Sequence, residues 1–157
     1  MRSLAETKVY KPDLDLIKKI VLDLHNKERA LLKIPLLELD EEICKTVSQP
    51  WAENLAAKNI FSHSKTKGYG ENIANRSPMD EKSAEKLFNQ WLNEKQNYKY
   101  AKYPEGNIDP SKQKGHYTQL IWKNSTKLGV GFAWKGKKCY LVTDYKPPGN
   151  ISGQYPY

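Results

Sequence analysis

Cysteine is scarce in this chain, and Cys44 and Cys139 are the only two among 157 residues. Two cysteines can form at most one disulfide, and neither belongs to a CxxC pair or to a Cys/His zinc pattern. The sequence therefore excludes a disulfide framework, and it leaves open whether these two cysteines pair.

Long apolar runs are also missing. No stretch of about 18 apolar residues occurs that could cross a bilayer. The first residues, MRSLAETKVYKP, lack the apolar middle region that a signal peptide needs. We therefore expect the chain as written to be soluble.

Positive charge and aromatic side chains are plentiful. Lysine and arginine number 26 against 18 acidic residues, which gives a net charge of +8, and ten tyrosines accompany four tryptophans. The length suits one domain with a single core. The charge favours anionic partners such as an acidic membrane surface. No nucleic-acid-binding motif accompanies it, so we predict no nucleic-acid partner.

Three helices are predicted from apolar periodicity and capping residues. Apolar residues recur at helical spacing over residues 13–32, with Asp13 placed to cap the first turn. Asp40 can cap a second helix, with a kink or break before Pro50, because a proline inside a helix costs about 3 kcal/mol. Ser77-Pro78 predicts the start of the third helix, with Ser77 as N-cap and Pro78 at the first helical position.

Strand patterns follow near the end of the chain. Residues 128–134 and 138–145 alternate in polarity, and Lys135-Gly136-Lys137 between them predicts a hairpin. Short extended stretches are expected near Ile60 and Ile73. The pattern as a whole indicates an α/β protein with helices around a small mixed or antiparallel sheet.

Four strings occur in a fixed order: HNKERALLKIPLL, HSKTKGYGENIA, QWLNEKQNY and GHYTQLIWKNSTKLGVG. In that order they resemble the CAP superfamily of cysteine-rich secretory, antigen 5 and pathogenesis-related proteins, and YKPPGN resembles the closing motif of that family. In its low cysteine count, the chain is most similar to the Golgi-associated plant-pathogenesis-related branch of the family. The resemblance implies a three-layer α/β/α sandwich with a small central antiparallel sheet. It divides the chain into an N-terminal extension (1–12), a CAP domain (13–150) and a C-terminal tail (151–157).

The resemblance carries the family's cleft tetrad onto His63, Glu71, Glu94 and His116, with the companions Trp91, Gln119 and Trp122. Imidazoles are neutral ligands that suit zinc or another divalent metal, so His63 and His116 are the predicted ligands. Two histidines alone predict weak binding. The alternative is a structural role, in which the four tetrad residues form a hydrogen-bonded polar cluster that holds the elements around the cleft together. A metal-assisted hydrolase is a third reading, although neither GxSxG nor HExxH is present and we predict no catalytic residue. The remaining histidine, His25, is expected at a packing boundary with local hydrogen bonds.

A long loop, residues 97–114, carries Tyr98, Tyr100 and Tyr103, interrupted by lysines. Tyrosine rings with polar tips favour apolar ligands and membrane interfaces. The corresponding loop of the CAP family is implicated in sterol binding, and a fatty acid is a second ligand of the family. The alternative is that these tyrosines only pack the loop onto the domain.

The sequence and the resemblance together predict a secreted, non-enzymatic binding protein for a sterol or fatty acid, with an auxiliary metal site. Two alternatives stay open at this point. One is a signalling or host-interaction protein that engages a receptor or forms a homodimer. The other is an intracellular protein attached to the membrane surface, as in the Golgi-associated branch.

Overall fold

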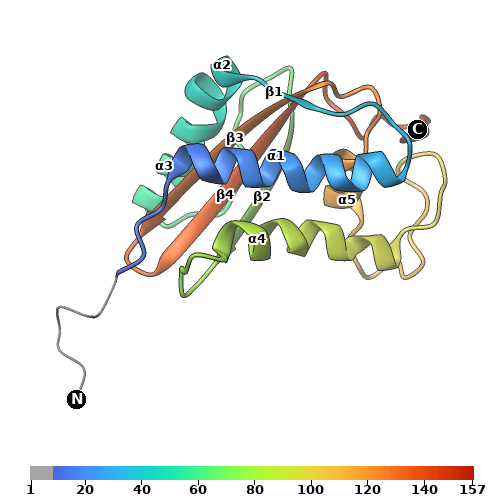
Figure 1. Ribbon diagram of the computed structural model, residues 1–157. Helices are drawn as coiled ribbons and strands as arrows, with labels where there is room; N and C mark the ends of the chain where they lie inside the picture. The colour runs from blue at the N-terminus through green and yellow to red at the C-terminus, as the bar shows by residue number, and fades with distance from the viewer. Residues whose placement is uncertain (1–8) are drawn as a thin grey trace.

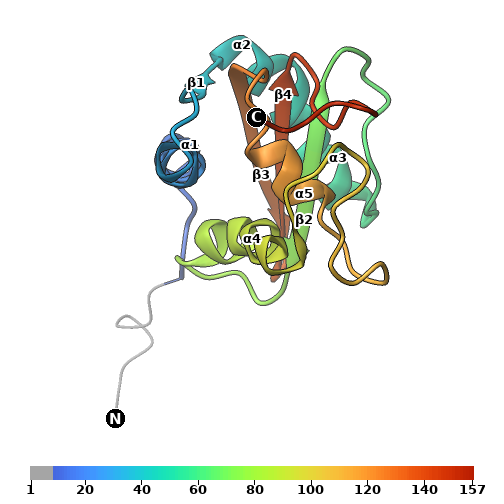
Figure 2. The same cartoon turned by 90° about the vertical axis from the view of Figure 1, so that its right-hand side faces the viewer.

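The structure, a computed structural model, describes residues 9–157. A four-stranded sheet forms the middle layer. Helices α1 (Leu14–Leu31) and α4 (Ser83–Leu92) cover one face, and α2 (Glu41–Ile43) and α3 (Gln49–Lys58) cover the other (Figure 1, Figure 2). The predicted three-layer α/β/α sandwich is confirmed. Every helix among residues 9–157 is too short or too polar to span a bilayer.

The sheet has the strand order β1-β3-β4-β2. Strands β2 (Gly70–Arg76), β4 (Lys138–Lys146) and β3 (Lys127–Lys135) are antiparallel neighbours. The two-residue strand β1 (Glu38–Leu39) runs parallel to β3, so the sheet is mixed at one edge. The predicted hairpin is confirmed, because Lys135 pairs with Lys138 and Gly136 adopts a φ of 60° in the turn between them.

Capping residues mark two of the three predicted helix starts. Asp13 accepts a hydrogen bond from the backbone N–H of Leu16 at 3.2 Å, and Asp40 accepts one from Ile43 at 3.1 Å. Before Pro50 the helix does not break. A π-helical segment, η2 (Cys44–Ser48), joins α2 to α3 and leaves Pro50 in the first turn of α3, where its missing N–H is tolerated.

Two predicted elements are wrong. The third helix begins at Ser83 and not at Ser77-Pro78, because the Pro78 carbonyl accepts a hydrogen bond from Arg76 and the Met79 N–H donates to Lys137, which holds this segment beside the hairpin. No strand forms near Ile60. The helix α3 ends there in a left-handed residue, and the Ile60 N–H caps the carbonyl of Leu55.

The core sits on both faces of the sheet, and it encloses one histidine and both cysteines. His25 is fully buried, which corrects its predicted place at a packing boundary; the aromatic residues Phe88 and Trp91 surround its ring. Both Cys44 and Cys139 are buried and free, so the two thiols do not pair. The close packing of η2 on the sheet requires glycine at 131, since a Cβ atom there would lie 2.2 Å from the Ser48 carbonyl oxygen.

Candidate functional site

The first half of the tetrad is formed by His63 and Glu71. His63 follows α3, and its Nδ1 lies 3.0 Å from Oε1 of Glu71 at the start of β2. The Ser64 N–H and hydroxyl also donate to this carboxylate, each at 2.8 Å. The hydrogen bond that His63 donates to the Glu71 carboxylate raises the pKa of His63, against the opposing effect of burial. The imidazole stays accessible, because 58% of the His63 side chain is exposed while only 8% of the Glu71 side chain is.

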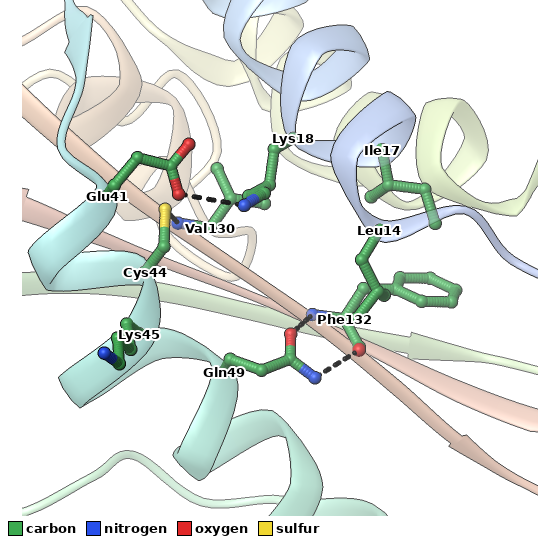
Figure 3. A pocket seen from close by; sticks show the side chains of 9 residues that line it. All are labelled: Leu14, Ile17, Lys18, Glu41, Cys44, Lys45, Gln49, Val130 and Phe132. Carbon is green, nitrogen blue, oxygen red and sulfur yellow. Dashed lines mark hydrogen bonds and ion pairs between the residues drawn. The ribbon is translucent and has the colours of Figure 1, made fainter.

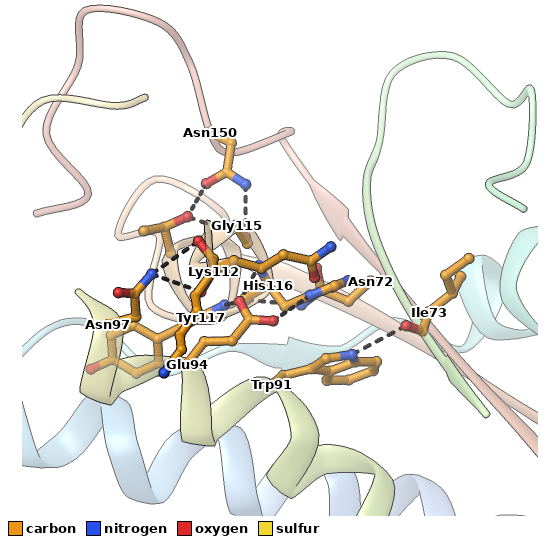
Figure 4. Close-up of polar contacts among 12 residues, drawn as sticks. Asn72, Ile73, Trp91, Glu94, Asn97, Lys112, Gly115, His116, Tyr117 and Asn150 are labelled. Atoms are coloured by element: carbon orange, nitrogen blue, oxygen red, sulfur yellow. Dashed lines mark hydrogen bonds and ion pairs between the residues drawn. The ribbon is translucent and has the colours of Figure 1, made fainter. Parts of the chain in front are cut away.

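The second half is formed by Glu94 and His116. Glu94 lies in the 3-10 helix η3 (Asn93–Asn97), and its Oε2 lies 2.6 Å from Nδ1 of His116 in helix α5 (Gly115–Leu120). Its other oxygen accepts the backbone N–H groups of His116 and Tyr117 at 3.0 and 3.2 Å (Figure 4). Trp91 stacks on the His116 ring with a centroid distance of 6.2 Å. One carboxylate thus fixes both the helix start and the imidazole.

The edge strand β2 separates these two His/Glu pairs. Successive side chains of a strand point to opposite faces, so Glu71 and Asn72 face different layers. Glu71 turns toward the segment after α3, and Asn72 donates to the His116 carbonyl at 3.0 Å on the other side. The tetrad is therefore two separate dyads held around one strand.

Both dyads open into one cleft. A cavity of about 370 Å³ and an adjoining one of about 450 Å³ both have His63, His116 and Gln113 in their walls. The first is otherwise polar, with Asn72, Asn107 and Asn150, and the second adds Phe61, Ile73 and Trp91. In both histidines Nδ1 is bound by a carboxylate, and Nε2 makes no hydrogen bond within residues 9–157.

This donor set fits a divalent metal only in part. A carboxylate on Nδ1 is the usual arrangement behind a metal-binding imidazole, because it fixes the tautomer and leaves Nε2 for the ion. Residues 9–157 contain no group of three or more His, Cys, Asp or Glu side chains placed to hold a metal. Two imidazole ligands remain, which is fewer than a tight zinc site has.

One acidic residue beside the tetrad was not predicted. Asp144 in β4 pairs directly with Glu71 in β2, and it is fully buried. Burial and the adjacent Glu71 carboxylate raise the pKa of Asp144. Burial alone would raise the pKa of Glu71 as well, but hydrogen bonds from His63, Asp144 and Ser64 lower it overall. The sequence does hold a signal for Asp144. It lies two residues after Val142 in the predicted strand, so the alternation of the strand places this acidic side chain on the same buried face as Val142.

The predicted tyrosine loop is not uniformly exposed. Tyr98 packs against Tyr117, and Tyr103 packs edge-on against Trp122. Tyr100 is 50% exposed and stacks on Tyr155 of the C-terminal tail. The tail also binds the loop through its backbone, with hydrogen bonds between Tyr103 and both Gly153 and Gln154. Two of the three tyrosines thus serve packing, as the alternative interpretation predicted, and one lies at the surface.

The remaining predicted companions stabilise the closing motif. Gln119 accepts the Gly149 N–H at 2.9 Å and donates to Ser125 at 3.1 Å. Trp122 is buried beside Gly149, where a Cβ atom would meet its ring at 2.7 Å. These residues hold the PPGN turn against α5 and do not enter the cleft walls.

A separate small cavity of about 130 Å³ lies between α1 and the α2–η2–α3 segment (Figure 3). Its floor is the outer edge of β3, where Cys44 Sγ accepts the Val130 N–H at 3.2 Å. The Gln49 amide binds both the N–H and the carbonyl of Phe132, each at 2.9 Å. These side chains occupy the positions that a further strand would take.

Residues 22–145 match the cysteine-rich secretory protein family, CAP. The chain is 37% identical over 137 residues to pathogenesis-related protein 1C of Nicotiana tabacum, which covers 87% of this chain and 78% of that protein. It is 28% identical to salivary antigen-5 of Dipetalogaster maximus, over 89% of this chain and 65% of that protein. Among solved structures, "Crystal structure of NaASP2 with Zn2+" superposes with a TM-score of 0.75 and 29% identity, covering 90% of this chain and 84% of that one. The ordered motifs, the sandwich and these relatives agree, and the chain belongs to the CAP family of cysteine-rich secretory proteins.

Proposed function

We propose that this protein is a secreted, non-enzymatic binding protein whose cleft takes a divalent metal ion through Nε2 of His63 and His116. One observation carries the proposal: each imidazole has its Nδ1 on a carboxylate and its Nε2 without a hydrogen bond within residues 9–157, and both rings line the same cavity. The name of a relative supports it, since the NaASP2 structure is described as containing Zn²⁺.

The expected affinity is modest. Two imidazoles supply half of a tetrahedral zinc shell, so water or a ligand atom completes it. Such an open site suits reversible binding, and the ion would add positive charge to a cleft whose walls otherwise hold amides, aromatic rings and the Lys114 side chain.

Zinc titration by calorimetry tests the proposal. We expect measurable heat with the wild-type protein, and loss of about tenfold or more in affinity for His63→Ala and for His116→Ala, because each removes one of two ligands. Gln113→Ala is the matched control, since Gln113 lines both cavities without an imidazole. Equal heats for the wild type and the double histidine variant would overturn the metal site.

A second candidate function is lipid binding at the surface of the tyrosine loop, with a sterol or fatty acid in an anionic membrane as the target. Tyr100, Tyr155 and Tyr157 form an exposed aromatic cluster, and the Lys102 ammonium lies 5.7 Å from the centroid of the Tyr155 ring. Aromatic rings beside a lysine suit a headgroup interface.

Vesicle sedimentation tests this candidate. We expect binding to phosphatidylserine vesicles that falls as salt is raised, because the attraction is electrostatic. The Tyr100→Ala/Tyr155→Ala variant should bind several-fold more weakly, and Tyr69→Ala, outside the cluster, should bind as the wild type does. Binding that is unchanged in the double variant would exclude this surface.

A further inference from the structure

The buried carboxyl group of Asp144 stands directly behind the His63 dyad. Register pairs Asp144 of β4 with Glu71 of β2, so the two side chains are cross-strand neighbours on the same face of the sheet, the face on which Ser48 of η2 lies. Asp144 is 0% exposed. No lysine, arginine or histidine within residues 9–157 forms an ion pair with it. The group therefore has no cation to offset a negative charge.

The hydrogen-bond donors around the two carboxyl groups are unequal. Glu71 receives bonds from His63, from the Ser64 N–H and from the Ser64 hydroxyl. Asp144 receives one bond, from the Ser48 hydroxyl in η2 at 2.7 Å, and its Oδ1 atom is buried without a donor in the described chain. Donors stabilise the ionised form of a carboxyl group.

Two adjacent buried carboxyl groups cannot both ionise without a large repulsive cost. We propose that Asp144 is the neutral member of this pair, donates its O–H to the Glu71 carboxylate, and so acts as a positioning residue for the His63 ring in the cleft. This inference deepens the proposed function, because it rests on the cleft as the binding site.

The shared proton explains why an acid can occupy this buried position. With the proton, Asp144 supplies the fourth donor to Glu71, and the carboxylate is fixed between β4, Ser64 and His63. Without it, Glu71 faces a second negative charge and moves away from β4, which displaces the imidazole that it holds. The shift of the Asp144 pKa above its ordinary value agrees with this assignment.

Carbon-13 NMR of the side-chain carboxyl groups tests the assignment directly. In the wild-type protein we expect the Asp144 signal at the position of a neutral acid from pH 5 to pH 7, while Glu71 stays ionised. An Asp144 signal that titrates near the ordinary aspartate pKa of about 4 would overturn the proposal.

Two variants test the positioning role with zinc as the probe. Asp144→Asn keeps a donor without a titrating proton, and we expect its zinc affinity to stay within about twofold of the wild type. Asp144→Ala removes the donor, and we expect about a tenfold loss, as when a ligand-orienting partner is removed. Equal affinities for the alanine variant and the wild type would overturn the role.

The unfolding equilibrium gives a readout that does not depend on metal. Between about pH 4 and neutral pH, Asp144 keeps its proton in the folded state and loses it in the unfolded state, so the wild type loses stability as the pH rises. The unfolding constant of the wild type divided by that of Asp144→Asn should therefore rise by up to tenfold per pH unit. If the wild type binds no zinc, the proposed metal site is wrong, but the Asp144 assignment is still tested. The carboxyl spectrum and this pH dependence measure its protonation without metal. If Asp144→Ala does not fold, the asparagine variant and the spectrum carry the test.

Discussion

The Nε2 atom of His25 lies 2.6 Å from the hydroxyl oxygen of Tyr145, and its Nδ1 lies 2.7 Å from the carbonyl oxygen of Val21. This pair ties the middle of α1 to the end of β4 through the core. Burial lowers the pKa of His25 to about 3, and nearby Arg29 acts in the same direction. The ring is therefore neutral at every pH at which the protein is expected to work.

A titration of stability should reveal this neutral histidine. The unfolded state takes up a proton below about pH 6.5 and the folded state does not until about pH 3, so His25 contributes stability that is lost as the pH falls between these values. We expect His25→Gln to be less stable at neutral pH and to lack this slope. Urea unfolding from pH 4 to pH 7.5 measures the unfolding free energy of both proteins. The contribution of His25 is the difference between the two curves, because Asp144 contributes a slope of opposite sign to both proteins over part of this range. Parallel curves would contradict the prediction.

Arg29 should tolerate no substitution, including lysine. It is fully buried, and its guanidinium donates to the carbonyls of Pro35, Leu120, Trp122, Lys123 and Ser125. Burial lowers its pKa to about 10, so it stays charged. We expect Arg29→Ala to cost about 3–5 kcal/mol of unfolding free energy, and Arg29→Lys nearly as much, since an ammonium cannot reproduce the planar fork.

Chemical denaturation compares these variants with Lys19→Ala. Lys19 lies on the exposed face of the same helix, with 72% of its side chain accessible. Its loss should change the unfolding free energy by about 0.5 kcal/mol or less. A lysine at position 29 that preserved wild-type stability would show that charge alone is required there.

Gln49 should protect the outer edge of β3. Its amide satisfies both backbone groups of Phe132. We expect Gln49→Ala to lose about 1–3 kcal/mol and to associate at high concentration, because unpaired strand groups attract a second chain. Analytical ultracentrifugation measures the association. Gln96→Ala, which changes an exposed glutamine in η3 away from the sheet, is the control and should stay monomeric where the Gln49 variant does not.

Gly131→Ala should be poorly tolerated. The added methyl group would meet the Ser48 backbone at 2.2 Å, and backbone cannot move aside as a flexible side chain can. We expect a loss of at least about 2 kcal/mol, at the scale of overpacked cores. Gly115→Ala has its nearest atom at 3.9 Å and serves as control. Equal melting temperatures would show that η2 can shift away from the sheet.

The sequence predicted those parts of the fold that depend on local signals. Asp13 and Asp40 cap helices through their own next turn, and the hairpin turn at Gly136 is encoded in adjacent residues. The start of α4 was not predictable, because Arg76 and the distant Lys137 decide it. Tertiary contacts override a local capping signal when they satisfy the same backbone groups.

The same division applies to the site. Family resemblance located the tetrad, but the sequence did not show which glutamate serves which histidine, nor that an edge strand separates the two dyads. Asp144 was missed because its significance lies in its register with Glu71, and register joins residues 73 positions apart. The tyrosine loop was only partly predictable, since the tail that covers it comes from the end of the chain.

Side chains take the place of a neighbouring strand along β2 and along the part of β3 that β1 does not pair with. On β3 the partners are Gln49 and Cys44, and on β2 the Trp91 indole and the Gln90 amide bind the carbonyls of Ile73 and Asn75. A second molecule could extend this sheet only by displacing those groups first. These contacts give a chain whose two cysteines are free a barrier against edge-to-edge polymerisation.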